Sequence, residues 1–370
     1  YTTIPVNAVL DYQPWMDDAR VEYLTAEEAC RNCLIDTLRI PGPVLDFVPR
    51  VFEVAEWAYI TPPAEVKTRQ VDGKAYIDFP VNRTELYPDY RRNPEELRAI
   101  KATIDVVEND PDVRIDSLSV WGYASPEGPW DNNVRLAKGR TATLIEYIRN
   151  LYNFPTSILR QGSTPEDWQG LIDRLRLTDI PNRDAIIAIA EDTVKYEPDA
   201  RNWKIQKEFP AQYKWILAEI YPALRHSDYT VYYTVKDYTD PAVIGEVMKT
   251  NPGKLSMGEM FTYANTLDPN SEEFAEVFDL AVRMFKDNEI ANLNAANTAL
   301  RQGHFDAADR YLAKSGNTPE ADYLRGVAAA LRQDYTTALP AFERASRAGF
   351  KAATDAIDQM RTKKLIPAEK

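Results

Sequence analysis

The chain has 370 residues, and its 57 Asp and Glu side chains outnumber 44 Lys and Arg, which gives a net charge of −13 at pH 7. A chain this acidic repels nucleic acid and anionic membrane surfaces, and no basic run is long enough to reverse the effect, so we expect no nucleic-acid partner. The length predicts two or three domains, and the absence of any apolar run of roughly 18 residues or more predicts no transmembrane helix.

Residues 1–66 are rich in proline and aromatic side chains, which favours short strands and turns over long helices. We interpret them as an N-terminal extension or as the remnant of a preceding β domain. Residues 51–60 alternate partly between apolar and polar side chains, which predicts a strand that leads into the proline pair that follows. Cys30 and Cys33 form a C-x-x-C pair that lacks two ligands of a zinc site, so a local disulfide or two free thiols is the favoured interpretation.

Residues 67–238 have the pattern of an α/β domain, because β-prone runs alternate with stretches whose apolar residues recur at helical spacing. Residues 166–225 interrupt this order. We interpret them as a helical insertion, which is tolerated because the entropy cost of closing a loop grows slowly with its length. The expected elements are strands at 74–79, 115–121, 156–160 and 229–235, a helix that begins at Asn93 and a helix over 136–151.

Residues 239–370 are predicted to be helical and contain an internal repeat. A Leu-Arg-Gln triplet that begins at Leu300 recurs at Leu331, whereas the spacing from Ala308 to Ala338 is one position shorter. The pattern resembles tetratricopeptide repeats, in which small residues let two helices pack closely and aromatic residues fill the groove between them. We predict two clear repeats and a weaker one at 256–287, with a generic array of helical hairpins as the alternative. The residues that fit the repeat are Ala296, Gly303, Phe305, Ala308 and Leu312, and then Gly326, Tyr335, Ala338, Phe342 and Ala345.

The most informative motif is at 120–128, where an apolar strand ends in a loop that contains two glycines and a proline. A helix follows and begins near two asparagines. Backbone N–H groups at the N-terminus of a helix hold carboxylates, and Arg140, about two turns into this helix, has the fork geometry to bind the same carboxylate. This combination is typical of a binding site, and the alternative for Arg140 is an ordinary solvated surface arginine.

The motif resembles the peptidoglycan-binding domain of the OmpA-like family. The family pattern is a Gly-aromatic-Thr-Asp loop, a glycine three residues later, an asparagine, and then Leu-Ser-x-x-Arg-Ala on a helix. The resemblance covers about 75–165 and 228–236 of this chain and implies a β-α-β-α-β sandwich. The matching residues are Gly122, Tyr123, Gly128, Asn133, Leu136, Arg140 and Ala142.

In the OmpA-like family the loop aspartate takes the amino group of a diaminopimelate residue, and the helical arginine takes its carboxylate. The resemblance therefore implies that Arg140 binds peptidoglycan peptide, with Tyr123 in the loop beside it. This chain departs from the family at the aspartate, whose place is taken by Ser125. Glu127 either supplies the missing negative charge or caps the helix that follows. Ser125 and Asn133 are candidates both for the ligand site and for holding the loop in place.

The sequence contains no recognisable catalytic centre, and we predict a non-enzymatic protein without a metal or another cofactor. Its two histidines, His226 and His304, lie in different regions, which argues against a multi-histidine metal site and a histidine-based triad. No glycine-rich phosphate-binding motif occurs. One alternative is a hydrolase within the insertion, which would bring together acids such as Asp167, Asp173 and Glu191.

These features predict an α+β protein, with an OmpA-like domain at 67–238 and an all-α tetratricopeptide-like domain at 239–370. The resemblance implies a place in the cell envelope, facing the periplasm or associated with the outer membrane, as in OmpA-like proteins of Bacteroides-type bacteria. We expect the first domain to bind peptidoglycan and the second to bind a protein partner on its concave face. The alternative is a structural, assembly or adhesion factor, associated with fimbriae, whose OmpA-like domain no longer binds peptidoglycan.

Overall fold

The computed structural model describes residues 9–11, 13–16, 19–29, 33–45 and 50–366. The chain divides into two compact units, one formed by Ala64–Ser256 and one that combines residues 1–63 with Met257–Lys370. The protein has a small mixed sheet and many helices, which is compatible with the α+β class. Of the two cysteines expected to form a local disulfide or to be free thiols, Cys30 lies outside the described residues.

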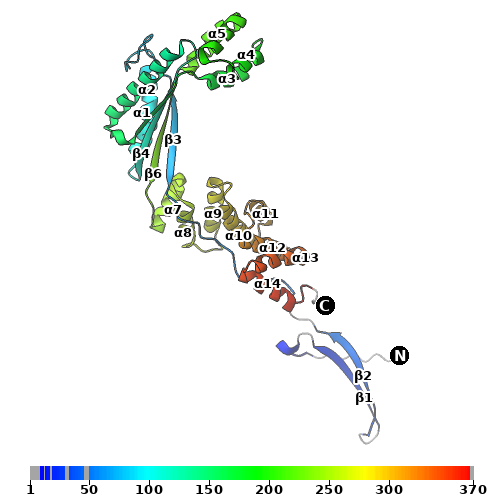
Figure 1. The fold of residues 1–370 in the computed structure, drawn as a ribbon. Helices are drawn as coiled ribbons and strands as arrows, with labels where there is room; N and C mark the ends of the chain where they lie inside the picture. The colour runs from blue at the N-terminus through cyan, green and yellow to red at the C-terminus, as the bar shows by residue number, and fades with distance from the viewer. Residues whose placement is uncertain (1–8, 12, 17–18, 30–32, 46–49, 367–370) are drawn as a thin grey trace. The chain divides into compact units, whose positions relative to one another are not determined.

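A four-stranded sheet with the order β3-β6-β4-β5 lies at the centre of the unit Ala64–Ser256 (Figure 1). Strand β6 is antiparallel to both of its neighbours, whereas β4 and β5 are parallel. Because β4 is an interior strand, its Leu118 and Val120 are fully buried. The strands are β3 (Thr68–Ala75), β4 (Val113–Tyr123), β5 (Leu159–Thr164) and β6 (Ser227–Val235).

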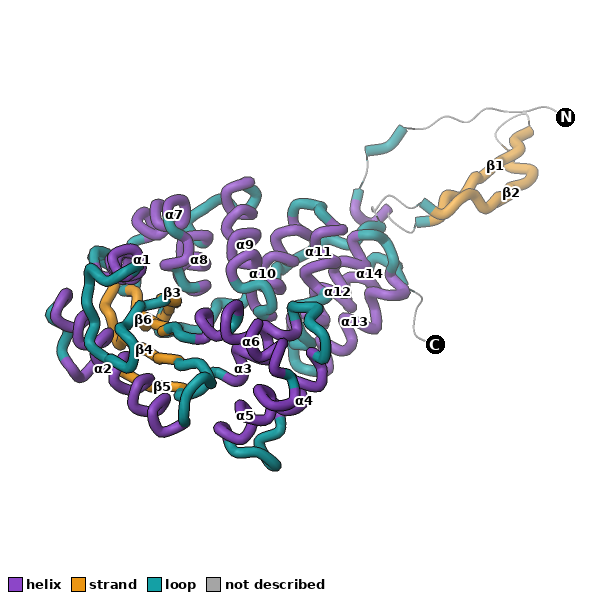
Figure 2. The backbone as a smooth tube through the Cα atoms, turned by 90° about the horizontal axis from the view of Figure 1, so that it is seen from above, coloured by secondary structure: helices purple, strands orange, loops and turns teal. Residues whose placement is uncertain are grey.

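Two amphipathic helices, α1 (Asn93–Glu108) and α2 (Trp130–Tyr152), cover one face of this sheet (Figure 2). Their apolar residues recur every three or four positions and therefore lie on one side of each helix. Leu151, an apolar residue in the last turn of α2, does not join this face and is 44% exposed. The residues that the two helices bury against the sheet are Leu97, Ile100, Ile104 and Val107 of α1, and Leu144, Ile145 and Ile148 of α2.

The first strand of the sheet lies earlier in the chain than the sequence predicted, because β3 overlaps the predicted 74–79 only at its end. After β3, backbone N–H groups hydrogen-bond to side chains of α1. The N–H of Tyr76 donates to Glu96 (2.9 Å), and the N–H of Asp78 donates to Asn93 (2.7 Å). Side-chain acceptors thus replace the strand partner that the alternating pattern implied.

The residues between β5 and β6 form the predicted helical insertion, which has an apolar core of its own. Its helices α3, α4 and α5 lie beyond the end of the sheet at which β5 ends and β6 begins (Figure 1). The insertion consists of α3 (Trp168–Arg176), α4 (Arg183–Glu191), α5 (Pro198–Glu208), α6 (Pro210–Glu219) and the 3₁₀ helix η3 (Tyr221–Leu224). Three further elements of the unit are the 3₁₀ helix η2 (Thr156–Ile158), α7 (Pro241–Thr250) and the 3₁₀ helix η4 (Pro252–Lys254).

The helices after residue 256 repeat in pairs. The first pair is α10 (Glu289–Arg301) and α11 (Phe305–Leu312), and the second is α12 (Pro319–Leu331) and α13 (Tyr335–Arg347). Each helix of the second pair begins the same number of residues after its counterpart in the first pair. The same spacing separates Ala308 from Ala338. The Leu-Arg-Gln triplets have a longer offset and are therefore not structurally equivalent. Gly326 allows α12 and α13 to pack closely, because a Cβ there would lie 2.6 Å from the ring of Phe342. The remaining helices are α8 (Met257–Ala264), α9 (Glu272–Met284) and α14 (Lys351–Thr362).

Helices α10, α12, α13 and α14 share one C-terminal geometry. A residue with positive φ follows each helix, and the next N–H reaches back five residues to a helical carbonyl, as His304 N does to Ala299 O (2.8 Å). This is the Schellman motif, which satisfies carbonyls that the helix end leaves free. The left-handed residues are Gly303 (φ 76°), Gln333 (φ 62°), Gly349 (φ 89°) and Lys364 (φ 56°).

Residues 50–63, here called the strap, belong to the same unit as these helices but form no strand, so the prediction for 51–60 was wrong. The strap backbone hydrogen-bonds to side chains of α10, α12 and α14. Phe52 and Ala58 are buried in the apolar core of the helices. Side-chain groups of the helices therefore satisfy the backbone that the sequence pattern assigned to a sheet. Earlier in the chain lie the 3₁₀ helix η1 (Pro14–Met16) and an antiparallel hairpin of β1 (Arg20–Ala29) and β2 (Cys33–Val44).

Exchanging residues at the left-handed positions is expected to change the free energy of unfolding. A side chain at positive φ costs about 1 kcal/mol relative to glycine, so Gln333→Gly should raise the unfolding free energy by about 0.5 to 1 kcal/mol. Gly303→Ala should lower it by a similar amount, and no atom lies within 4 Å of the added Cβ. Urea denaturation followed by circular dichroism measures both, and two unchanged midpoints would contradict the expectation.

Candidate functional site

The predicted binding loop, residues 124–129, leaves the sheet at the end of β4 and leads directly into α2. The backbone holds it to both neighbouring strands. Ala124 N donates to Thr164 O (3.1 Å), and Tyr123 N donates to the carbonyl of His226 (2.8 Å), which immediately precedes β6. The loop is therefore fixed where the ends of β4, β5 and β6 meet.

Helix α2 approaches β4 so closely that position 122 requires glycine. A Cβ at Gly122 would lie 2.0 Å from Oγ1 of Thr141, a buried residue of α2. Gly128 differs, because its φ is not positive and a Cβ there would make an ordinary 3.4 Å contact with Asn133. Of the two glycines in the motif, Gly122 alone has no room for a Cβ.

Ser125 and Glu127, the two loop residues considered for a ligand, both bind Arg225. The Nε of Arg225 donates to Oγ of the buried Ser125 at 3.0 Å, and its Nη2 forms an ion pair with the carboxylate of Glu127. Arg225 is distant from Ser125 in the sequence and was not among the predicted site residues. Arg225 therefore neutralises Glu127, the acid that the sequence suggested as a partner for the ammonium group of a ligand.

Asn133 holds the loop from the side of α2. Its Nδ2 donates to the carbonyl of Gly128 (3.0 Å) and to Oε1 of Glu166 (3.0 Å). The other oxygen of Glu166 accepts from the indole of Trp168 at 2.8 Å. Burial raises the pKa of Glu166, and these two hydrogen bonds oppose that effect. Asn133 thus links the loop to the start of the insertion.

Arg140, the predicted ligand-binding arginine, has no acidic partner among the described residues. Its Nε donates to the carbonyl of Arg83 (3.2 Å), and its guanidinium lies over the ring of Phe79, 5.1 Å from the centroid. Burial lowers the pKa of Arg140, and the nearby positive charges of Arg225 and Arg135 lower it further. The carbonyl of Arg83 thus takes the Nε of Arg140, and the ring of Phe79 covers one face of the guanidinium plane. Nη1 and Nη2 remain available to a ligand.

The N-terminus of α2 cannot share a carboxylate with Arg140. Helix α2 begins at Trp130, just before the paired asparagines, so Arg140 lies about three turns, or roughly 15 Å, along the helix axis. The N–H of Trp130 is already bonded to Asp199 (2.9 Å). The expectation that helix N–H groups and Arg140 converge on one ligand group was therefore wrong.

Tyr123 packs against His226. The two rings are stacked with centroids 4.3 Å apart. The buried imidazole lies between two carboxylates, with Nε2 3.5 Å from Asp167 and Nδ1 3.0 Å from Asp228. Burial raises the pKa of Tyr123, and the negative charges of Asp228 and Asp167 raise it further. His226, like Arg225, is a part of the site that the sequence did not predict.

The three acids considered for a hydrolase do not form one centre. Asp173 and Glu191 both contact the exposed Arg176, at 3.4 and 2.7 Å, whereas Asp167 faces His226. Within the described ranges, no group of three or more His, Cys, Asp or Glu side chains is arranged to hold a metal ion.

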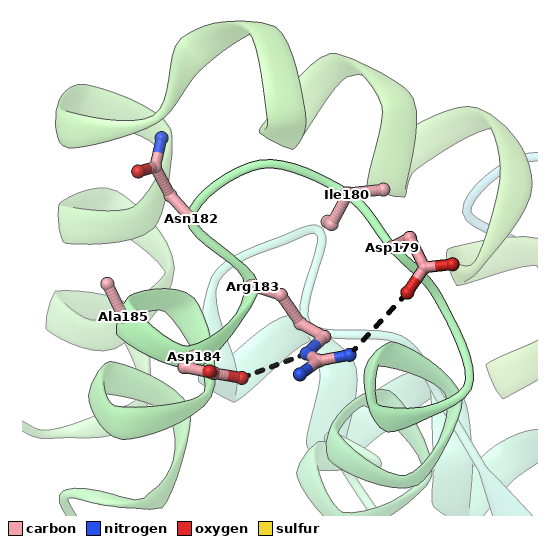
Figure 3. Close-up of a pocket in the computed structure, with 6 residues that line it drawn as sticks. All are labelled: Asp179, Ile180, Asn182, Arg183, Asp184 and Ala185. Atoms are coloured by element: carbon pink, nitrogen blue, oxygen red, sulfur yellow. Dashed lines mark hydrogen bonds and ion pairs between the residues drawn. The ribbon is translucent and has the colours of Figure 1, made fainter.

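An open pocket of about 320 Å³ lies in the loop between α3 and α4 (Figure 3). Its Arg183 is neutralised locally, with Nε 2.8 Å from Asp184 and Nη1 4.0 Å from Asp179. The pocket is formed by one short run of residues, and its single arginine is already paired with its two aspartates. The lining residues are Asp179, Ile180, Asn182, Arg183, Asp184 and Ala185.

The surface of the helical unit that is lined by α10, α12 and α14 carries the strap. A partner that uses the same contacts must therefore replace the strap. For the part of the chain that the structure describes, none of the helices combines the length and apolar character needed to cross a membrane.

No protein-family model matches this chain, and no curated protein matches its sequence.

The close approach of α2 to β4 can be tested with a double-mutant cycle. Gly122→Ala should lower the free energy of unfolding by about 1 to 3 kcal/mol, because the new methyl group overlaps Thr141. Adding Thr141→Ala removes the hydroxyl, so the double variant should be more stable than the sum of the single effects predicts. Gly128→Ala serves as the control and should change stability little. Strict additivity in chemical denaturation would contradict this packing.

The pH dependence of stability should report the burial of Glu166. Because its pKa is raised in the folded protein, the contribution of Glu166 to stability is fully present below the pKa of the unfolded chain and is lost as pH rises through the folded pKa. The stability advantage of the wild type over Glu166→Gln should therefore be larger at pH 4.5 than at pH 7. Urea titrations at both values measure it, and an advantage that grows with pH would contradict the assignment.

Proposed function

We propose that this protein is a non-enzymatic binding protein of the bacterial cell envelope, and that Ala64–Ser256 is an OmpA-like domain that binds a carboxylate of peptidoglycan peptide at Arg140. The motif at 120–142 supports the proposal. So does the sheet, in which a closing strand, β6, follows the β-α-β-α-β order and pairs with β4. On this proposal the protein faces the periplasm or associates with the outer membrane.

The observation that carries the proposal is the guanidinium of Arg140, which contacts a carbonyl and an aromatic ring but no acid among the residues that the structure describes. A partly buried arginine normally finds a carboxylate, because desolvating its charge without a partner is unfavourable. Here a carbonyl and an aromatic ring orient the guanidinium, and Arg225 and Arg135 add positive potential. A carboxylate that binds Nη1 and Nη2 would form two parallel hydrogen bonds and relieve the repulsion between the arginines.

The ligand chemistry follows from the partners of Glu127. In the OmpA-like family an aspartate takes the ammonium group of diaminopimelate, but in this chain Ser125 stands at that place and Arg225 neutralises Glu127. The guanidinium of Arg225 thus lies against Ser125 and Glu127, where a ligand ammonium group would otherwise bind. We therefore propose that the site recognises the carboxylate of diaminopimelate and makes no use of its ammonium group.

The second candidate is an assembly or adhesion factor whose OmpA-like domain has lost its cell-wall ligand. The observation in its favour is the same ion pair between Glu127 and Arg225, because it leaves no free negative charge on Glu127 for a ligand ammonium group. On this candidate the helical unit makes the functional contacts, with other proteins.

Calorimetric titration with muropeptides separates the two candidates. A peptide that contains diaminopimelate should bind the wild type saturably. Arg140→Ala should weaken binding by about tenfold or more, because one bidentate charge-assisted contact contributes roughly 1.5 to 3 kcal/mol. Acetylating the free amino group of diaminopimelate should leave the affinity unchanged, whereas a lysine peptide, which lacks the second carboxylate, should not bind.

Arg174→Ala, which changes an exposed arginine of α3, is the matched control and should bind as the wild type does. Equal binding by Arg140→Ala, or no binding by the wild type at millimolar peptide, would refute the carboxylate site and favour the assembly candidate.

A further inference from the structure

The strap is held by a ladder of side-chain amides. Gln359 of α14 binds both the N–H and the carbonyl of Glu53, at 2.8 and 3.0 Å. Asn297 of α10 binds both groups of Ala58, at 3.0 and 2.8 Å. Asn294, one turn earlier, does the same for Ile60 at 2.8 and 2.8 Å. Each amide thus acts as one rung of a β ladder and fixes the register of the strap.

The amides of this ladder bind only backbone atoms of the strap. They therefore require an extended backbone but do not select particular side chains. Ala58 and Ile60, two residues apart, both direct their N–H and carbonyl groups toward α10, as alternate residues of a strand do. A hydrogen bond from Tyr59 N to Trp57 O (3.0 Å) bends the backbone slightly at Ala58. Between the amide rungs, the hydroxyl of Tyr323 on α12 donates to the carbonyl of Glu56 (2.7 Å). The groove formed by α10, α12 and α14 is therefore built to bind a peptide backbone.

Apolar anchors give the groove its specificity for the strap sequence. The ring of Phe52 lies 5.5 Å from that of Phe342. Tyr59 packs against Phe278 with centroids 5.5 Å apart, and its hydroxyl is 3.1 Å from that of Thr298. Ala58 is 5% exposed, so a larger or charged side chain does not fit there. The groove is thus complementary to this sequence in both backbone and side chains.

The groove also needs an occupant. Asn294 and Asn297 are 2% and 0% exposed, and the strap provides acceptors and donors for their amides. Removing the strap would leave these groups without their partners and would expose the apolar surface that Phe52 and Ala58 cover. The strap itself contains no helix or strand, so its contacts do not depend on secondary structure of its own.

We propose that the groove accepts the strap of a second copy of this chain in place of its own, so that copies join by segment exchange. Exchange conserves every contact, because the incoming segment is identical to the outgoing one. Within one chain the strap has a high effective concentration, so the closed monomer dominates in dilute solution and exchange increases with protein concentration. The inference is independent of the ligand at Arg140 and identifies a partner for the helical unit.

Two full-length variants that complement each other test the proposal. The groove variant, Asn294→Ala/Asn297→Ala, keeps an intact strap but loses two rungs. The strap variant, Phe52→Ala/Ala58→Arg, keeps an intact groove but cannot fill it. Each alone should be monomeric by size-exclusion chromatography with light scattering, and an equimolar mixture should form a one-to-one heterodimer. A mixture that stays monomeric, although both variants keep the helical circular dichroism of the wild type, would overturn the proposal.

A labelled peptide of residues 50–63 gives an independent measurement by fluorescence anisotropy. It should bind the strap variant at least tenfold more tightly than the groove variant. A Glu56→Ala peptide is the matched control and should bind equally, because the exposed Glu56 contributes only its backbone carbonyl to the contact with Tyr323. Peptide binding without heterodimer formation would also overturn exchange between copies.

If either variant fails to fold, the wild type decides the matter. Refolded from denaturant at high concentration, an equal mixture of ¹⁴N- and ¹⁵N-labelled wild type should give dimers that contain both labels in native mass spectrometry. A purely monomeric product would overturn the proposal.

Discussion

The fold of Ala64–Ser256 depends on β6, which lies between β3 and β4 and hydrogen-bonds to both. Without it the sheet would consist of β4 and β5 with β3 detached, and the buried surfaces of Tyr229 and Val231 would be missing from the core. Because β6 begins at Ser227, it also carries His226 and Arg225 to the loop that follows β4. The pairing that completes the core thus also completes the site.

The helical unit is completed in a comparable way. Its strap comes before the sheet in the sequence, yet it fills the groove between helices that come after the sheet. In both units a β-like segment from a distant part of the chain satisfies buried polar groups and covers apolar surface. In the sheet the partner groups are backbone, and in the groove they are the amides of Asn294, Asn297 and Gln359. Completion by an extended segment is therefore the common principle of the two units.

The sequence predicted what local periodicity controls. Apolar residues at helical spacing predicted α1 and the helical character of 166–225, and Leu97, Leu171 and Ile186 are buried in the apolar cores of these segments. Local patterns could not show where a backbone finds its partner. The strap alternates like a strand, but amide side chains hold it, and β3 ends where Glu96 and Asn93 capture the chain.

In the candidate site, too, the sequence predicted the residues of a local motif and missed those that depend on contacts between distant segments. Arg140 and Gly122 were identified from a local motif. The close approach at Gly122 lies within the strand and helix of that motif, whereas Arg140 contacts Arg83 and Phe79 in the segment between β3 and α1. Arg225 was missed because its role depends on a pairing between distant parts of the sequence. An available signal was the predicted strand at 229–235, since antiparallel pairing with 115–121 would place the residues before it beside the loop.

The proposed carboxylate site at Arg140 is tested most directly by a crystal structure of the protein with a diaminopimelate-containing peptide. The account predicts a ligand carboxylate that bridges Nη1 and Nη2 of Arg140, while the ion pair between Glu127 and Arg225 stays intact. A peptide bound elsewhere, or one whose ammonium group displaces Arg225 from Glu127, would contradict it.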